Sequence, residues 1–213
     1  KSAAKQFVKF VGEKQSSPVS KRANRGKGVF GVKLFDFSKA KGHELVSDED
    51  AGIDPDVIAT SEKVLYSNKS VAIFFLDVRS NRTPWGEKAM KKNNEGDFLG
   101  EEQWLWFETA IRRSEASVNV IVSGLQVLSE RYPDANLSEE WNKFPKATER
   151  LYNTILQNGV RAPIIVSGDV HLAQFLRRDC IRHGDNVRSL MEITTSGLTH
   201  SWGTCFSPRV NHH

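Results

Sequence analysis

Short apolar runs alternate with amphipathic segments over residues 64–213. The unbroken apolar run at 71–76 is typical of a strand buried on both faces of a sheet. Further short apolar segments predict strands at 118–122, 163–166 and 190–194. Helical spacing predicts helices at 101–113, with Trp104, Leu105, Phe107 and Ile111 inward, and at 147–158, with Leu151, Ile155 and Leu156 inward and Gly159 as C-cap. Alternating strands and helices predict an α/β layered domain.

The first 63 residues have a different character. Helical spacing near the N-terminus predicts one amphipathic helix among lysines, formed by Ala4, Phe7, Val8, Phe10 and Val11. Ser16-Ser17-Pro18 is expected to end this helix, and the stretch that follows as far as Gly31 has the composition of a loop. Residues 36–60 are acidic and rich in turn residues, which indicates a surface excursion. We therefore divide the chain into a joining segment, 1–63, and a domain portion, 64–213.

The composition is that of a protein with a packed interior. Its 12 Phe and 5 Trp carry rings that need burial, and 38% of the 213 residues are hydrophobic. No apolar run approaches the roughly 20 residues that span a bilayer, so we expect no transmembrane segment. The formal net charge of +4 is mild, and much of the basic excess lies in the first 33 residues. We interpret this stretch as a solvated entry segment and do not expect nucleic acid as a partner.

The cellular compartment stays open from the sequence. Cys180 and Cys205 permit one disulfide or two free thiols. The chain begins at Lys1 without a charged and then apolar leader, so we expect either a processed product or a fragment.

Polar residues follow each of the four predicted strands. The segments are DVR at 77–79, SGLQ at 123–126, SGDVH at 167–171 and TSGLTH at 195–200. Because ligand sites in such sheets lie where strands end and loops begin, these four segments are expected to converge on one site.

Asp169 and His171 are the best candidates for metal ligands. A carboxylate oxygen together with an imidazole nitrogen suits iron, manganese or zinc, and the carboxylate can also bridge to calcium. The tripeptide alone favours an alternative in which Asp169 caps a helix that starts near His171 and the histidine is packed and hydrogen-bonded.

Other candidates suit an anionic substrate. Arg79 and Arg82 carry guanidinium forks that match phosphate oxygens, although Arg79 could instead form a structural pair with Asp77. Gln126 could donate to a bound anion or hold a water, or it could be a surface turn amide. His200 could be a ligand, a proton donor or a residue at the rim.

Two common nucleotide-binding motifs are absent. The sequence contains neither Gly-x-Gly-x-x-Gly after a strand nor Gly-x4-Gly-Lys-Ser/Thr. The tryptophans Trp104, Trp106, Trp141 and Trp202 are expected to serve packing rather than base stacking.

Six segments together resemble the PhoD-like (alkaline phosphatase D) branch of the calcineurin-like metallophosphoesterases. They occur in the family's order: FLDVRSNR at 75–82, LGEEQW at 99–104, SGLQVL at 123–128, WNKFP at 141–145, SGDVHLA at 167–173 and TSGLTH at 195–200. The resemblance implies a four-layer α/β/β/α sandwich that hydrolyses phosphomonoesters or phosphodiesters by a metal-bound hydroxide. It also implies metal ions, with iron and calcium expected and manganese or zinc as alternatives, and a secreted or membrane-associated setting.

The resemblance assigns roles to individual residues. Asp169 and His171 correspond to metal ligands, and Asp77, Arg79 and Arg82 to a segment near the site. We expect Arg79 and Arg82 to bind the substrate and Arg79 to make an additional phosphate or transition-state contact. We include Gln126 and His200 with Arg79 as candidate catalytic residues.

The sequence departs from the family in one respect. The earlier ligand motifs, such as Trp-Asp-Asp-His-Asp, do not occur, and His43 is the only histidine before His171. The chain therefore resembles the C-terminal half of the domain, so the N-terminal half or a partner chain is an expected partner. The alternative is a catalytically inactive relative with a structural or binding role in a larger assembly.

Overall fold

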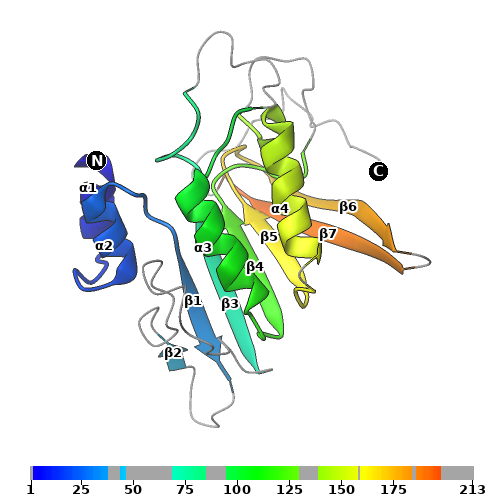
Figure 1. Ribbon diagram of the computed structural model, residues 1–213, viewed down its shortest axis with the longest axis horizontal. Coiled ribbons are helices and arrows are strands. Elements are labelled where there is room, and N and C mark those ends of the chain that lie inside the picture. The colour runs from blue at the N-terminus through cyan, green and yellow to red at the C-terminus, as the bar shows by residue number, and fades with distance from the viewer. Residues whose placement is uncertain are drawn as a thin grey trace.

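The computed structural model describes residues 2–37, 44–46, 69–84, 95–129, 139–157, 159–183 and 186–197. These residues form a seven-stranded mixed sheet with the strand order β2-β1-β3-β4-β5-β7-β6 (Figure 1). The strands are β1 (Gly31–Asp36), β2 (Glu44–Val46), β3 (Ser70–Leu76), β4 (Val118–Ser123), β5 (Pro163–Ser167), β6 (Ala173–His183) and β7 (Asn186–Thr195). The helices are α1 (Ser2–Phe10), α2 (Pro18–Arg25), α3 (Glu101–Arg112) and α4 (Pro145–Gln157), with a short 3₁₀ helix at Trp141–Lys143.

The four predicted strands form the centre of the sheet. They are β3, β4, β5 and β7, which lie side by side and run parallel to one another. The two predicted helices are also present, as α3 between β3 and β4 and α4 between β4 and β5. Because parallel strands end at the same edge of a sheet, the described residues of the polar segments after β3, β4, β5 and β7 share one edge, as expected.

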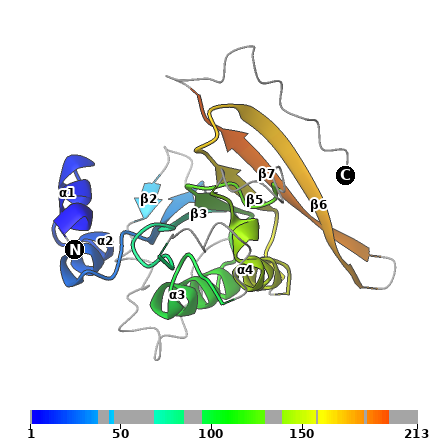
Figure 2. The same cartoon turned by 90° about the horizontal axis from the view of Figure 1, so that it is seen from above.

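One face of the sheet is covered by helices. In Figure 2, α3 and α4 lie on the same side of the sheet, and the residues of β3 and β4 alternate between buried and less buried positions. Phe74 on this covered face contacts the rings of Trp106 and Phe107 from α3. The predicted packing role of the tryptophans is confirmed for Trp104, Trp106 and Trp141, which are buried, whereas Trp202 lies outside the described residues.

One predicted core position in α3 is wrong. Leu105 was expected on the packed side of this helix, but its side chain is 60% exposed, and Trp106 is fully buried instead. The larger indole contributes more apolar burial, so the helix turns Trp106 toward the sheet.

The opposite face of the sheet is apolar and is not buried. We call it the open face, formed by outward-facing residues of β1 and β3–β7 that are all half-buried or exposed: Phe35, Val71, Ile73, Phe75, Val120, Val122, Ile164, Val166, Phe175, Met191 and Ile193. A parallel sheet is normally covered on both faces. The described residues thus supply one sheet and one helical layer of the expected four-layer sandwich.

The N-terminal segment is more ordered than the sequence suggested. Helix α1 is present as predicted, but its apolar residues Phe7 and Phe10 are exposed, as is Val11 just after its end. The stretch expected to be a loop forms α2, because Ser17 acts as N-cap, accepting a hydrogen bond of 3.1 Å from the Ser20 backbone N–H, and Pro18 occupies the first turn. The Ser-Pro pair therefore starts a helix.

Strand β1 follows α2 and is part of the main sheet. It pairs antiparallel with β3 along six residues, from Gly31 opposite Phe75 to Asp36 opposite Ser70. Of the predicted acidic excursion at 36–60, only residues 36–37 and β2 are described, and Asp36 is the last residue of β1.

Candidate functional site

The loop after β3 is shaped by the buried carboxylate of Asp77. Its Oδ1 accepts hydrogen bonds from the backbone N–H groups of Arg79 (3.0 Å) and Ser80 (2.9 Å), and its Oδ2 accepts one from Val29 (2.8 Å). Gln103 from α3 holds the Asp77 backbone on both sides, donating to its carbonyl and accepting from its N–H. Asp77 thus contacts the backbone of Arg79, which leaves the guanidinium of Arg79 to other groups.

The guanidinium of Arg79 lies between two carboxylates. Its Nη1 is 2.5 Å from Glu139 Oε2, and its Nη2 is 3.9 Å from Asp169 Oδ1, beyond β5. Arg82 Nη1 is 2.9 Å from the other oxygen of Glu139. The structure therefore brings together Arg79, Arg82 and Asp169, as expected, and adds Glu139.

The loop after β5 has an unusual backbone. Asp169 and His171 both have positive φ, at 75° and 55°, a region that residues other than glycine seldom occupy. Ser196, just after β7, holds the loop: its hydroxyl accepts a 3.1 Å hydrogen bond from His171 N–H, and its own N–H donates to Leu172. Strained residues of this kind cost roughly 1–3 kcal/mol each and cluster at functional sites.

One expected alternative for this loop is wrong. The segment after His171 starts a strand, β6, at Ala173, and no helix begins there for Asp169 to cap. Both Asp169 and His171 are exposed, so their side chains are accessible from outside the described structure.

Gln126 lies beneath this edge rather than at the surface. Its side chain is only 2% exposed, which contradicts the surface-amide alternative. Its Nε2 donates to Thr194 Oγ1 (2.9 Å) and to Gln174 Oε1 (3.1 Å), and the Thr194 and Ser167 hydroxyls are 2.9 Å apart. Gln126 therefore joins the ends of β4, β5, β6 and β7 in one polar network, and its role in catalysis stays a prediction.

Glu192 on β7 fixes the loop that contains Gln126. Its carboxylate accepts hydrogen bonds from the backbone N–H groups of Val127 (2.9 Å) and Leu128 (2.6 Å). Burial raises the pKa of Glu192 above its ordinary value, and hydrogen bonds from Ser167, Leu128 and Val127 offset only part of this rise.

The sequence could not single out Glu139 and Glu192 as site residues. Glu139 lies 60 residues from Arg79, and Glu192 lies 64 from Leu128. Their partners depend on the order of the strands in the sheet, and the spacing of residues along the sequence does not reveal that order. Gln103 lies in the LGEEQW segment, so the family resemblance was a signal for it.

The described residues do not by themselves fit a metal cluster. Asp169 and His171 supply two donor groups at one strand end, and no group of three or more His, Cys, Asp or Glu side chains able to hold a metal occurs in the described part of the chain. His200, the other candidate, lies outside the described residues, as does Cys205. Further ligands would have to come from elsewhere.

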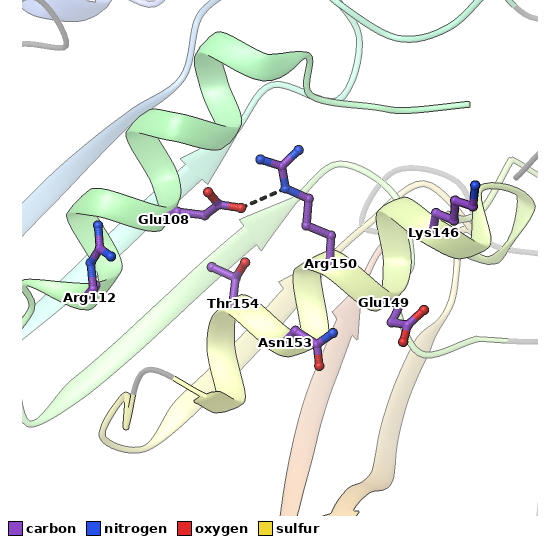
Figure 3. A pocket seen from close by; sticks show the side chains of 7 residues that line it. All are labelled: Glu108, Arg112, Lys146, Glu149, Arg150, Asn153 and Thr154. Atoms are coloured by element: carbon purple, nitrogen blue, oxygen red, sulfur yellow. Dashed lines mark hydrogen bonds and ion pairs between the residues drawn. The ribbon is translucent and has the colours of Figure 1, made fainter. Parts of the chain in front are cut away.

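A separate cavity lies between α3 and α4. It measures about 420 Å³ and is lined by charged and polar side chains: Glu108, Arg112, Lys146, Glu149, Arg150, Asn153 and Thr154 (Figure 3). Burial lowers the pKa of Arg150, but the hydrogen bonds and charges of Glu108 and Glu101 outweigh it and raise the pKa overall. The guanidinium of Arg150 donates hydrogen bonds to both of these carboxylates.

The family of the chain follows from a comparison with protein-family models. The model described as PhoD-like phosphatase matches residues 66–209, which include Arg79, Gln126, Asp169 and His171. The chain belongs to the PhoD-like phosphatase family.

Two further comparisons give less. No curated protein matches the chain. Among solved structures, one titled "Structure of PhoD" is similar, with 18% identity and a TM-score of 0.48, over 59% of this chain and 26% of that chain. The chain thus spans about a quarter of that protein. None of the helices in the described ranges is long and apolar enough to cross a membrane.

Proposed function

We propose that this chain is the C-terminal part of a metal-dependent phosphoesterase that hydrolyses phosphomonoesters or phosphodiesters. The observation that carries the proposal is the contact between Arg79 and Asp169, 3.9 Å apart, which joins the loops after β3 and β5. The contact puts a candidate phosphate-binding guanidinium beside a candidate metal-binding carboxylate. Membership of the PhoD-like phosphatase family supports this interpretation.

In this proposal each residue has a distinct task. Arg79 and Arg82 bind the phosphoryl oxygens, and Arg79 stabilises the charge that develops in the transition state. Asp169 and His171 provide two of the metal ligands. The metals, iron and calcium in our proposal and manganese or zinc as alternatives, would supply charge neutralisation and activation of the nucleophile. Gln126 lies beneath the candidate site and holds the strand ends in register. His200 is a candidate metal ligand or proton donor.

The remaining ligands would come from the other half of the domain. The open face offers that half a place to pack, since apolar surface on two facing sheets is stabilised by mutual burial. Phe175 on this face is 77% exposed, and Phe75 and Met191 are also exposed. We therefore propose that a second sheet, from an N-terminal half or a partner chain, covers the open face and completes the site.

Hydrolysis by the full-length protein tests the proposal. The purified protein, supplied with iron and calcium or with manganese or zinc, is assayed with p-nitrophenyl phosphate and bis-p-nitrophenyl phosphate. We expect metal-dependent hydrolysis, which Asp169→Asn and Arg79→Met each reduce by roughly 100-fold or more.

Matched controls separate the site from general surface effects. Asp179→Asn and Arg177→Met replace an exposed Asp and an exposed Arg that form an ion pair on β6, and both should leave activity unchanged. A full-length protein that folds but hydrolyses neither ester with any of these metals would refute the proposal. That result would instead favour an inactive family member with a structural or binding role.

A further inference from the structure

Glu139 bridges two arginines at the candidate site. Oε2 of its carboxylate is 2.5 Å from Arg79 Nη1, and Oε1 is 2.9 Å from Arg82 Nη1. One oxygen is thus assigned to each guanidinium. Glu139 comes from the segment before the 3₁₀ helix, whereas both arginines follow β3.

This arrangement matches the way in which two guanidinium groups bind a phosphoryl group. In such binding, two oxygens of one anion each face a different guanidinium, and the two carboxylate oxygens of Glu139 already occupy these positions. A phosphoryl group and the Glu139 carboxylate cannot both take these positions, because like charges at such separations repel. A ligand anion must therefore displace Glu139 from at least one arginine.

The ion pairs of Glu139 with Arg79 and Arg82 are weak enough for an incoming anion to displace the carboxylate. The Arg79 side chain is 55% exposed and that of Glu139 is 29% exposed. Exposed pairs contribute little net free energy, because solvent screens them and the side chains lose entropy, so an incoming anion can replace one. Arg82 is more buried, at 18%, and is the fixed member of the pair.

We propose that Glu139 is an internal competitor, an anion of the chain itself that occupies the phosphoryl position and lowers the affinity of the two arginines for a ligand anion. A ligand anion binds only in the fraction of molecules in which the carboxylate has left a guanidinium, so the apparent dissociation constant is the intrinsic one divided by that fraction. This inference rests on the proposed function and adds an autoinhibitory contact at the same site.

Inorganic phosphate is the probe that tests the inference without catalysis. The full-length protein, kept free of metal with a chelator, is titrated with phosphate while the Arg side-chain Nε–Hε NMR signals are followed. Glu139→Gln keeps the shape of the side chain and removes its charge. We expect the phosphate dissociation constant of this variant to fall by roughly threefold to tenfold.

Two further variants isolate the site. Glu95→Gln breaks another carboxylate ion pair of 2.5 Å, with Lys146, and should leave phosphate affinity unchanged. Arg79→Met combined with Glu139→Gln should abolish the gain, because the vacated guanidinium is then missing. Glu139→Ala, which keeps no polar group, should gain affinity as the Gln variant does.

Turnover provides a second readout. In the active protein, Glu139→Gln should lower KM for p-nitrophenyl phosphate and for bis-p-nitrophenyl phosphate, because the carboxylate competes with both esters for the same guanidinium groups. Unchanged or weaker phosphate binding by both Glu139 variants would overturn the inference and make Glu139 a group that positions Arg79. Because the phosphate titration needs no hydrolysis, it decides this inference even where the proposed function fails.

Discussion

The carboxylate of Glu192 accepts a 2.6 Å hydrogen bond from the backbone N–H of Leu128, a residue 64 positions away in the sequence. Its second oxygen accepts from Val127. These two bonds tie the loop after β4 to strand β7 on the helix-covered side of the sheet. Because Gln126 directly precedes Val127 in that loop, the Glu192 carboxylate also fixes the position of the Gln126 side-chain amide, which links the strand ends.

Replacing Glu192 should therefore destabilise the fold. In Glu192→Gln, an NH₂ group faces one backbone N–H, so one buried donor loses its acceptor, at a cost of about 1–3 kcal/mol. Glu192→Leu leaves both N–H groups unsatisfied and should cost more. Urea unfolding measures the difference, with Glu149→Gln, an exposed glutamate on α4, as a control expected within about 0.5 kcal/mol of wild type. A Leu variant as stable as wild type would show that the two bonds contribute nothing.

The raised pKa of Glu192 gives this carboxylate a distinct pH dependence. The folded state holds the Glu192 proton more tightly than the unfolded state, because burial disfavours the charge. Its contribution to stability is therefore full below the ordinary glutamate pKa and is lost as the pH rises through the raised pKa of the folded state.

A comparison with the uncharged variant isolates this effect. The free energy of unfolding of wild type minus that of Glu192→Gln should fall as the pH rises above the ordinary glutamate pKa, since only the wild-type residue ionises. Urea titrations at a series of pH values measure the difference. A difference that stays constant, or that rises with pH, would contradict the raised pKa.

The central strands could be predicted because apolar residues on both faces of a strand leave a clear pattern in the sequence. Strand β3 contains a continuous apolar run, strands β4, β5 and β7 contain short segments that are mostly apolar, and the helices between them repeat apolar residues at helical spacing. The outer strand β6 was missed, since its Gln174-Phe175-Leu176-Arg177-Arg178 run mixes charged and apolar residues, as an edge strand requires. Helix α2 was missed because Ser17-Pro18 fits a loop and a helix start equally well locally.

The candidate site was predictable only where a residue type follows a strand end. That rule placed Arg79, Gln126 and Asp169 at one edge of the sheet. It could not show that Gln126 is buried in a polar network, nor that Glu139 lies between Arg79 and Arg82. These relationships depend on which strands are neighbours and on how the loops fold back, and both are tertiary properties.

Asp77 should prove essential to the loop that carries Arg79. In Asp77→Asn one carboxylate oxygen becomes an NH₂ group, so a backbone N–H among those of Val29, Arg79 and Ser80 loses its acceptor. We expect a loss of about 1–3 kcal/mol in the free energy of unfolding, measured by urea titration. Asp179→Asn, at an exposed site on β6, should have little effect.

The same substitution should also weaken phosphate binding, because the Arg79 backbone is released. Arginine side-chain NMR during a phosphate titration measures this second effect. An Asp77→Asn protein that keeps both wild-type stability and wild-type phosphate affinity would show that the loop holds its shape without the carboxylate.

His171 should show a conflict between stability and function. Its φ of 55° is unfavourable for any residue with a Cβ, and glycine adopts this conformation without steric cost. We expect His171→Gly to keep or raise the free energy of unfolding, by up to about 1 kcal/mol, while hydrolysis by the full-length protein falls roughly 100-fold as the imidazole is lost. Ala162, at φ 39°, is the matched control, because Ala162→Gly relieves the same kind of strain away from the candidate site. Thermal unfolding and p-nitrophenyl phosphate hydrolysis are measured on both variants. If His171→Gly keeps its activity, the imidazole has no part in the reaction. If His171→Gly is clearly less stable than Ala162→Gly, the positive φ of His171 stores no strain and its side chain stabilises the fold.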